Sequence, residues 1–591
     1  MTSKYAFTGV LVLFLSIFVL SSCGGGSSSI AAPIATPTPG PSATYQNPLS
    51  IKLSDGTYME SCPDPTILKS QTEGDNGWYL YCTNEEFHDG GTPHLMAISR
   101  SEDLVNWNYV GDVFSQLPAG AAAGAGLWAP DVDFFNGKYY IYFSVSQTVA
   151  GGSAIFVASS NSPAGPWSSA TQVVEPEPAN CCGGQPRSTI DPEMVTDTDG
   201  SRYLFFGSYY GGIFARKLSD DGLSTLPATE VQIALDNRYE ASYVVKKNGY
   251  FYLMVSSGNC CAGPLSGYGV FAARSENVLG PYVDRDGHSL LESRIGGTPV
   301  MITNGNQWVG PGHNGTVSDA NGQDWIIYHA VNVNNPTYAS NGETRRPVMM
   351  DELDWINEWP VVRGGAGPSN GSIAAPAVTV SSFTPATAIA SDAPGSLISA
   401  YSDEFIAPAL SPQWQWHGSS PTNLWSLSNG QFQLQSQAGD ITNTAMLTEA
   451  APSGNYMVEV KLSTNVPLSG VYNYVQGGVL LYKDNSNFVK LGETAIGSTR
   501  QIEFGKQMTA PGYGYTVASA PGDSAWIRLV KRTTNGQELY TSYSSQDGTT
   551  WERGGTWTHS LGTGARLGLF SMAGAGFTVQ FDYVRVYNLA N

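Results

Sequence analysis

Five segments of the chain repeat one pattern of polar and hydrophobic positions. Each begins with a polar or aromatic residue, continues through residues that favour β-strands, turns at a glycine near an aromatic residue, and ends in a second aromatic-rich strand. The segments cover residues 63–79, 128–140, 190–203, 240–251 and 312–325. Strand-rich units that recur about every 50 to 70 residues are typical of a β-propeller. The sequence therefore predicts a five-bladed β-propeller.

Several segments share the distance between the leading residue and the turn glycine. Asp191, Glu240 and His313 each stand nine residues before the glycine, and Trp128 has this position in the second segment. Asp64 stands thirteen residues before its glycine, which indicates a four-residue insertion in the hairpin. In a propeller, positions of the same phase point toward the central axis. We therefore expect these four polar residues and an aromatic side chain to surround one pocket.

The N-terminal residues predict a targeting segment and a tether. Residues 20–23 follow a short apolar run and resemble a bacterial lipobox, which implies cleavage before Cys23 and lipidation of its thiol. The alternative is an ordinary secretory signal that happens to contain a cysteine. We expect residues 1–23 to be a lipoprotein signal peptide that anchors the protein in the bacterial cell envelope. Residues 24–45, rich in Gly, Ser, Pro and Ala, are expected to form a flexible linker.

A second stretch rich in Pro, Ala, Ser and Thr divides the rest of the chain. We predict the propeller over residues 46–365, a linker over 366–397 and a second β-rich domain over 398–591. No segment shows a strong helical pattern, and β-branched and aromatic runs alternate with Gly, Asn and Asp turns. The expected class is therefore all-β.

Composition narrows the range of partners. Charged residues make up 13% of the chain, about half the usual share. The net charge is −20, so there is no basic surface to bind phosphates, and nucleic acid is excluded as a partner. The abundant aromatic residues suit stacking on sugar rings, although most of them must belong to the core. We expect a monomer.

Six cysteines remain after Cys23, an even number that permits disulfides in an exported chain. Cys62 and Cys82 flank the hairpin of the first segment and could pair. The other four form two adjacent pairs, and no Cys-x-x-Cys spacing or His-rich tract indicates zinc. Structural cysteines are therefore favoured. The adjacent pairs are Cys181-Cys182 and Cys260-Cys261.

The acidic residues of the repeated pattern suit hydrolysis of a glycosidic bond. That reaction needs one carboxyl group to protonate the leaving oxygen and another to activate water or attack directly. A third acid nearby can raise the pKa of the proton donor by like-charge repulsion. Singly, Asp64 and Asp191 could be turn residues before proline, and Glu240 a surface residue. Their shared phase favours a functional set.

Several segments around these residues resemble glycoside hydrolase family 43. The likeness is carried by residues 101–107, 128–131, 190–193 and 235–253. Within that family the chain most resembles the α-1,5-L-arabinanases, through Cys260-Cys261 after the acid strand and through 279–287 and 310–314. The resemblance extends over residues 46 to about 365.

The resemblance implies roles for individual residues. Asp64 would be the general base, Glu240 the general acid, and Asp191 the group that tunes and orients the acid, in a reaction that inverts the anomeric centre. His313 matches a histidine that ligates calcium on the propeller axis, although calcium prefers oxygen ligands and a hydrogen-bonded core histidine is the alternative. Trp128 would be a sugar-stacking platform, or else a core residue between blades.

One part of the resemblance is imperfect. Residues Cys62-Pro63-Asp64 stand where the family usually has a histidine directly before the Asp-Pro pair, so the surroundings of the base are expected to differ. A Cys62–Cys82 bridge could replace the contact that this neighbour provides. Arg345 and Arg346, ahead of a proline, receive no catalytic role.

The second domain resembles the concanavalin-A-like β-sandwich, a jelly-roll fold, of family 43 β-xylosidases. The likeness lies in residues 402–405 and 577–587, and residues 477–482 are expected to form an inner strand. The preceding linker would let this domain either pack on the propeller or move freely. Sugar binding and structural packing both remain open, and so do both roles for its tryptophans. These are Trp414, Trp416 and Trp425.

The sequence thus predicts an exported, lipid-anchored arabinanase that acts on plant cell-wall arabinan or arabino-oligosaccharides, with endo action preferred. The first alternative is an exo-acting α-L-arabinofuranosidase or β-xylosidase on the same scaffold. A fructan-active propeller would show Arg-Asp-Pro and Glu-Cys pairs, whereas this chain has Ile190-Asp191 and Glu240-Ala241. A non-catalytic glycan-binding lipoprotein is another alternative, but it would not need to keep a general acid.

Overall fold

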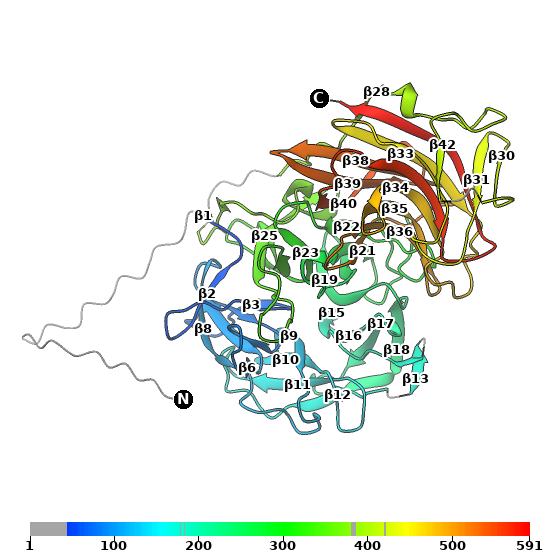
Figure 1. Ribbon diagram of the computed structural model, residues 1–591. Coiled ribbons are helices and arrows are strands. Elements are labelled where there is room, and N and C mark those ends of the chain that lie inside the picture. The colour runs from blue at the N-terminus through cyan, green and yellow to red at the C-terminus, as the bar shows by residue number, and fades with distance from the viewer. Residues whose placement is uncertain (1–43, 178, 183, 380–385, 419–420, 591) are drawn as a thin grey trace, which may run out of the picture. The chain divides into compact units, whose positions relative to one another are not determined.

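The computed structural model describes residues 44–177, 179–182, 184–379, 386–418 and 421–590 (Figure 1). These residues form β-strands and three 3₁₀ turns, η1 (Gly263–Leu265), η2 (Arg363–Gly365) and η3 (Ser399–Tyr401). The all-β prediction is confirmed. None of the helices among the described residues has the length and apolar character needed to cross a bilayer. Cys23, the predicted signal peptide and most of the first linker lie outside the described residues.

Five sheets follow one another along the chain and surround a common axis (Figure 1). Blade 1 consists of β3 (Thr66–Lys69), β4 (Trp78–Tyr81), β7 (Ala97–Ser101) and β8 (Asn106–Asp112), with β2 (Ser50–Lys52) added in parallel to β8. Blade 2 consists of β9 (Leu127–Phe135), β10 (Lys138–Val145), β11 (Ala154–Ser160) and β12 (Thr171–Val174). Blade 3 consists of β15 (Glu193–Thr196), β16 (Arg202–Ser208), β17 (Gly212–Leu218) and β18 (Thr225–Ala234). Blade 4 consists of β19 (Glu240–Lys247), β20 (Tyr250–Ser257), β21 (Gly269–Ser275) and β22 (Thr298–Met301). Blade 5 consists of β23 (Trp308–Ser318), β24 (Asp324–Asn332), β25 (Val348–Ile356) and β26 (Trp359–Val362). The five-bladed propeller prediction is confirmed.

The blades are held together by apolar side chains packed between neighbouring sheets. The middle strands carry nearly continuous hydrophobic runs because both of their faces are covered. Ile141 and Phe143 of blade 2, for example, are fully buried and pack with Tyr81 and Ile98 of blade 1. Two short hairpins extend from this framework, β5 (Glu85–Glu86) with β6 (Pro93–His94) and β13 (Asn180–Cys182) with β14 (Gln185–Pro186).

One residue at the start of each blade has a left-handed backbone conformation, and these five residues form what we call the axial ring. They are Asp64 (φ 53°), Ala129 (46°), Asp191 (57°), Ala241 (55°) and His313 (50°). Such a conformation costs a residue other than glycine about 1–3 kcal/mol, so the surroundings must enforce it. Each backbone N–H donates to a side chain of the preceding blade. The acceptors are Thr83 Oγ1 for Ala129 (2.8 Å), Ser144 Oγ for Asp191 (2.9 Å), Asp191 Oδ2 for Ala241 (3.1 Å), Ser256 Oγ for His313 (3.0 Å) and His329 Nδ1 for Asp64 (3.2 Å). The ring therefore closes between blade 5 and blade 1.

The axial ring corrects the phase that was expected from the turn glycines. Ala129 and Ala241, not Trp128 and Glu240, are the backbone equivalents of Asp64, Asp191 and His313. Both the turn and the strand before it vary in length. The hairpins of blades 2 and 4 turn over two residues and those of blades 3 and 5 over five, whereas the strand segment between the axial-ring residue and the turn is one residue longer in blades 2 and 4. The glycine therefore does not mark a fixed distance from the axis.

Residues of the C-terminal part form a sandwich of two antiparallel sheets. One sheet has the order β29 (Gln415–His417), β32 (Met446–Ala450), β41 (Arg566–Met572), β34 (Gln476–Asp484), β35 (Asn487–Ile496), β36 (Thr499–Gln507) and β37 (Tyr513–Val517). The other has the order β30 (Trp425–Ser428), β31 (Gln431–Gln435), β42 (Thr578–Leu589), β33 (Tyr456–Thr464), β38 (Ala525–Thr534), β39 (Gln537–Ser545) and β40 (Glu552–His559). Residues 477–482 lie in the central strand β34, as predicted. The sandwich prediction is confirmed.

The predicted linkers contribute short strands. In the first, β1 (Thr44–Tyr45) pairs with β27 (Ile373–Ala374) of the second. The second linker also contains β28 (Pro394–Leu397), which pairs with the last strand of the sandwich, β42. Both linkers are therefore partly tied into the fold.

The sandwich packs directly on the propeller. Backbone hydrogen bonds join Ile295 to Arg500 (3.1 Å) and Thr556 to Thr303 (2.8 Å). A Cβ on Gly267 would lie 1.6 Å from the carbonyl oxygen of Tyr515, so the two backbones touch. Of the two arrangements left open by the sequence, the described residues adopt the packed one.

The remaining structural expectations concern cysteines and tryptophans. Cys62 is bonded to Cys82, and each adjacent cysteine pair is bonded within itself. Trp414 is buried and donates its indole N–H to Asp403 (2.9 Å), while Trp416 and Trp425 pack against the sandwich core. Trp414 therefore has the core role, whereas Trp416 and Trp425 are only partly buried and both of their roles stay open.

Candidate active site

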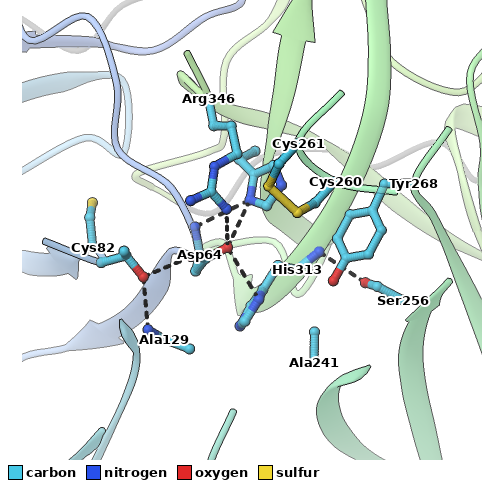
Figure 2. Close-up of polar contacts among 12 residues, drawn as sticks. Asp64, Cys82, Ala129, Ala241, Ser256, Cys260, Cys261, Tyr268, His313 and Arg346 are labelled. Atoms are coloured by element: carbon cyan, nitrogen blue, oxygen red, sulfur yellow. Dashed lines mark hydrogen bonds and ion pairs between the residues drawn. A yellow bond between two sulfur atoms is a disulfide. The ribbon is translucent and has the colours of Figure 1, made fainter. Parts of the chain in front are cut away.

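Asp64 is buried at the propeller axis, where three cationic or imidazole groups face one of its oxygens. Oδ1 lies 2.8 Å from Nη1 of Arg346, 3.3 Å from Nδ1 of His313 and 3.2 Å from Nδ1 of His329 (Figure 2). The other oxygen, Oδ2, accepts a 2.7 Å hydrogen bond from the hydroxyl of Thr83. Burial opposes ionisation, but the charge of Arg346 and then the contact with His313 hold the pKa of Asp64 well below its usual range.

His329 fixes the backbone of Asp64 rather than supplying a charge. Burial lowers the pKa of His329 to about 4, so the imidazole is neutral near pH 7. A neutral ring can accept the Asp64 N–H at Nδ1, which closes the axial ring at 3.2 Å. The ring of Tyr268 stacks on this imidazole with centroids 5.8 Å apart and planes 7° apart.

Glu240 lies directly before the axial-ring residue Ala241 and is held by two hydroxyl groups. Oε1 accepts a 2.7 Å hydrogen bond from Tyr268, and Oε2 accepts one of the same length from Ser208. Burial raises the pKa of Glu240, while the two hydroxyls lower it and the charge of Asp64 raises it. The net pKa lies above the usual value for a glutamate.

Asp191 belongs to the axial ring and is also buried. Its Oδ2 accepts the N–H of Ala241, which places its carboxylate beside Glu240. Burial first, and then the negative charges of Glu240 and Asp64, raise the pKa of Asp191 well above its usual range. Because Asp191 and Glu240 repel each other, the pair retains a proton to higher pH than either carboxyl would alone. The structure thus brings together all three predicted carboxyls.

The sandwich supports the surroundings of Glu240 from two directions. Arg238, two residues earlier in the chain, is fully buried and donates to Gln501 Oε1 (2.9 Å) and to the carbonyl of Ala518 (3.4 Å). Gly267, which touches Tyr515, directly precedes Tyr268, the hydroxyl donor to Glu240. Strand β37 therefore lies against the loop that presents this donor.

Trp128 lies at the start of β9, and its side chain is 39% exposed. Its indole folds back over Gly126, where a Cβ would come within 2.1 Å of Nε1. This exposure is incompatible with a core position between blades. It leaves the indole free for a ligand at the end of the propeller where the axial ring lies.

Calcium binds six to eight oxygen ligands, and the side chains around His313 supply few of them. His313 turns Nδ1 toward Asp64, which leaves Nε2 for an ion. Among the described residues no cluster of three or more His, Cys, Asp or Glu side chains could hold a metal. These residues therefore fit calcium only as one imidazole ligand, with water supplying most of the coordination.

Several residues of the site had no role in the sequence prediction. Arg346 is the clearest case, since it forms the shortest ion pair with Asp64. A signal for others does exist, because a hydroxyl or imidazole residue follows each turn glycine by six to eight positions. These residues are Thr83, Ser144, Ser208, Ser256 and His329. Each of them hydrogen-bonds an axial-ring N–H or Glu240.

Two family models match the chain. The model of glycosyl hydrolases family 43 matches residues 57–360, and the model of the β-xylosidase C-terminal concanavalin A-like domain matches residues 402–587. The extracellular endo-α-(1→5)-L-arabinanase 1 of Bacillus subtilis (strain 168) is 32% identical over 314 residues, which cover 52% of this chain and 88% of that protein. The extracellular exo-α-(1→5)-L-arabinofuranosidase of Cellvibrio japonicus (strain Ueda107) is 30% identical over 341 residues, 53% of this chain and 90% of that protein. A solved structure of the Cellvibrio cellulosa α-L-arabinanase complexed with arabinohexaose is 28% identical, covers 51% of this chain and 96% of its own, and superposes with a TM-score of 0.44.

Proposed function

The chain belongs to glycosyl hydrolase family 43, and from this premise we propose that it cleaves α-1,5-L-arabinofuranosidic bonds in arabinan and arabino-oligosaccharides. The observation that carries the proposal is the convergence of Asp64, Asp191 and Glu240 at the axial ring, with opposite pKa shifts for Asp64 and Glu240. A glycosidase needs one ionised and one protonated carboxyl at the same pH. Two relatives that are 32% and 30% identical over 314 and 341 residues are named as arabinan-active enzymes, which supports the choice of substrate.

In the proposed reaction Asp64 is the general base. The guanidinium of Arg346 and the hydroxyl of Thr83 orient its carboxylate, which takes a proton from a water molecule. The water oxygen forms the new bond to the anomeric carbon, while the bond from that carbon to the leaving oxygen breaks. Glu240 gives its proton to the leaving oxygen. Attack from the face opposite the leaving group inverts the anomeric centre.

Asp191 is proposed to act on Glu240 rather than on the substrate. Its carboxylate accepts the N–H of Ala241 and so fixes the backbone next to the acid. Two like charges so close together disfavour ionisation of both carboxyls, and the pair therefore keeps a proton available for transfer by Glu240. Trp128 is proposed as an apolar platform for a sugar ring, which its exposure supports.

Substitution of the two reacting carboxyls tests the assignment. Asp64→Asn and Glu240→Gln should each lower kcat on debranched arabinan by about 10²–10⁴-fold, the usual contribution of general acid–base catalysis. For Glu240→Gln, an aryl arabinoside with a good leaving group should lose less, because it needs less protonation. Asp55→Asn, at a fully exposed turn residue, is the matched control. If either active-site variant kept more than a tenth of the wild-type kcat, its assigned role would be wrong.

An exo-acting α-L-arabinofuranosidase or β-xylosidase is the second candidate. Relatives named as endo and as exo enzymes align with the same propeller, and the sandwich matches the model of a β-xylosidase C-terminal domain. We propose endo action. Early products from debranched arabinan should then be a ladder of oligosaccharides, whereas release of one short product from the outset would favour the exo alternative. Xylo-oligosaccharides test the β-xylosidase alternative in the same chromatographic assay.

The setting of the enzyme is also a proposal. We propose that it is exported and lipid-anchored at Cys23. The extracellular names of the relatives support export, and the lipobox-like residues 20–23 are the basis for the anchor. We also propose a calcium ion on the axis beside His313, ligated mainly by water. When bound, it would supply positive charge and order water near Asp64. The anchor is tested by globomycin-sensitive processing and by tritiated-palmitate labelling of wild type against Cys23→Ala. Metal analysis of the purified enzyme tests the calcium ion.

A further inference from the structure

The sandwich sheet that runs from β29 to β37 carries a cluster of tyrosines, which we call the tyrosine face. It consists of Tyr474, which precedes β34, and of Tyr513 and Tyr515 on β37. The side chains of Tyr474 and Tyr513 are 59% and 38% exposed. The rings of Tyr513 and Tyr515 are 6.4 Å apart and within 25° of parallel, so they present similarly oriented faces.

A buried polar chain fixes the two exposed tyrosines. The carbonyl of Tyr474 accepts a 3.0 Å hydrogen bond from Gln476, whose other amide atom accepts one from Lys490. Lys490 pairs with Glu503 at 3.1 Å, and Glu503 accepts the hydroxyl of Tyr513 at 2.6 Å. The lysine and the glutamate are each only 5% exposed. A buried ion pair contributes little net stability, but it fixes the orientation of the groups that it binds.

The ring of Tyr513 lies flat on the sheet. Gly505 on the neighbouring strand has no side chain, and a Cβ there would come within 2.0 Å of the Tyr513 hydroxyl. The face is therefore aromatic, and the charges of Lys490 and Glu503 oppose each other beneath the ring of Tyr513. Such a surface suits the C–H face of a sugar ring. With a net charge of −20 on the whole chain, an uncharged glycan is a better ligand than an acidic one.

The tyrosine face begins beside the candidate active site. The carbonyl of Tyr515 touches Gly267, and a Cβ on Gly514 would lie 2.4 Å from the carbonyl of Leu265. The next residue after Gly267 is Tyr268, which donates to Glu240. Tyr210, two residues after Ser208, which donates to Glu240, has a side chain that is 47% exposed.

The position relative to Glu240 determines which part of a substrate the face would meet. A general acid protonates the leaving oxygen, so the surface beyond it receives the leaving-group portion of the chain. We propose that Tyr474, Tyr513 and Tyr515 form a binding site for the leaving-group portion of a neutral polysaccharide, continuous with the catalytic site. This inference rests on the proposed role of Glu240. It assigns the sandwich a part in substrate binding.

Gel retardation tests the face without relying on catalysis. Asp64→Asn protein, with and without Tyr474→Ala and Tyr513→Ala, is run in native gels that contain debranched arabinan or arabinoxylan. The double tyrosine variant should show an apparent Kd about tenfold higher, equivalent to about 1.4 kcal/mol. Tyr474→Ala alone leaves the Lys490–Glu503 pair intact and should give part of this loss. Tyr58→Ala, at a propeller tyrosine that is 54% exposed, is the matched control and should not change retardation.

Chain-length dependence provides the second readout. In otherwise wild-type enzyme, the ratio of kcat/KM for arabinohexaose to that for arabinobiose should fall about tenfold in the double variant and stay constant in Tyr58→Ala. If wild type hydrolyses arabinan but the double variant keeps both its retardation and this ratio, the proposed binding role of the tyrosine face is refuted and the proposed function stands. If wild type hydrolyses no arabinan but the double variant loses retardation, the binding role of the tyrosine face is upheld and the proposed substrate is wrong. Concentration-dependent dimerisation of wild type that the double variant abolishes would assign the face to a second copy and overturn the proposal.

Discussion

Replacing Tyr268 with phenylalanine should move the alkaline limb of the pH–kcat/KM profile to higher pH. The hydroxyl of Tyr268 donates a 2.7 Å hydrogen bond to Oε1 of Glu240 and so lowers the pKa of that carboxyl. Without this donor the ionised form of Glu240 is less stable, its pKa rises, and the acid keeps its proton to higher pH. The alkaline limb is therefore expected to shift to higher pH.

The magnitude follows from the strength of one hydrogen bond to a charged group. Such a bond contributes about 1.5–3 kcal/mol, and one pKa unit corresponds to about 1.4 kcal/mol. Ser208 continues to donate to Oε2, and Glu240 keeps some exposure to solvent, so water can partly replace the lost hydroxyl. We therefore expect a shift near the lower end of this range, roughly one pH unit.

The assay is kcat/KM against pH on one arabino-oligosaccharide, because this parameter reports the ionisation of the free enzyme. Tyr209→Phe is the matched control. Its hydroxyl donates at 2.7 Å to the carbonyl of Gly258 instead of to a carboxylate, so its alkaline limb should stay in place. A Tyr268→Phe enzyme with an unmoved or lowered alkaline limb would refute the reasoning, even if its rate fell.

Three further predictions concern the same region. Asp191→Asn removes one carboxyl of the repelling pair, so the alkaline limb should shift to lower pH together with a fall in rate. A loss of rate at an unchanged limb would leave Asp191 only a positioning role. Gly267→Ala places a methyl group 1.6 Å from the carbonyl of Tyr515 and should lower stability by about 1–3 kcal/mol, with a drop in kcat. Gly371→Ala, where a Cβ meets nothing within 4 Å, should leave Tm unchanged, and equal Tm values for the two variants would contradict the prediction. Chelation should reduce kcat or Tm and added calcium should restore it, whereas active enzyme without stoichiometric calcium by metal analysis would return His313 to hydrogen bonding.

The fold could be predicted because its signals are local. Alternating strands and turn glycines recur in each blade, and they identify the number of blades without knowledge of their packing. Asp64 and Asp191 could be found for the same reason, since each precedes a proline at the start of an inner segment. The phase of Glu240 was off by one residue, because the lengths of the turn and of the strand before it vary between blades and sequence spacing does not record them.

The rest of the site depends on contacts between distant parts of the chain. Arg346 reaches Asp64 from blade 5, and the two residues are separated by 282 positions. The orientation of Tyr268 depends on a loop that packs against β37 of another domain. His329 lies in an apolar middle strand, where a buried imidazole gives no pattern of its own. Sequence spacing cannot reveal such pairings, because they are set by how the sheets close around the axis.

In the axial ring the backbone has a structural role, and the side chains supply the reactive groups. In every blade the same backbone N–H is held by the preceding blade, yet the side chain at that position is an aspartate, an alanine or a histidine. The side chain at this position can therefore vary. The hydrogen bonds of the main-chain N–H groups maintain the pseudo-fivefold arrangement, and they do not depend on which side chain the axial-ring residue carries. Ala129 and Ala241 are suitable positions for introducing a new functional side chain, because the backbone at both alanines already has the conformation found at Asp64 and Asp191. An engineered carboxylate or imidazole at Ala129 would face the same axis without a change in the frame.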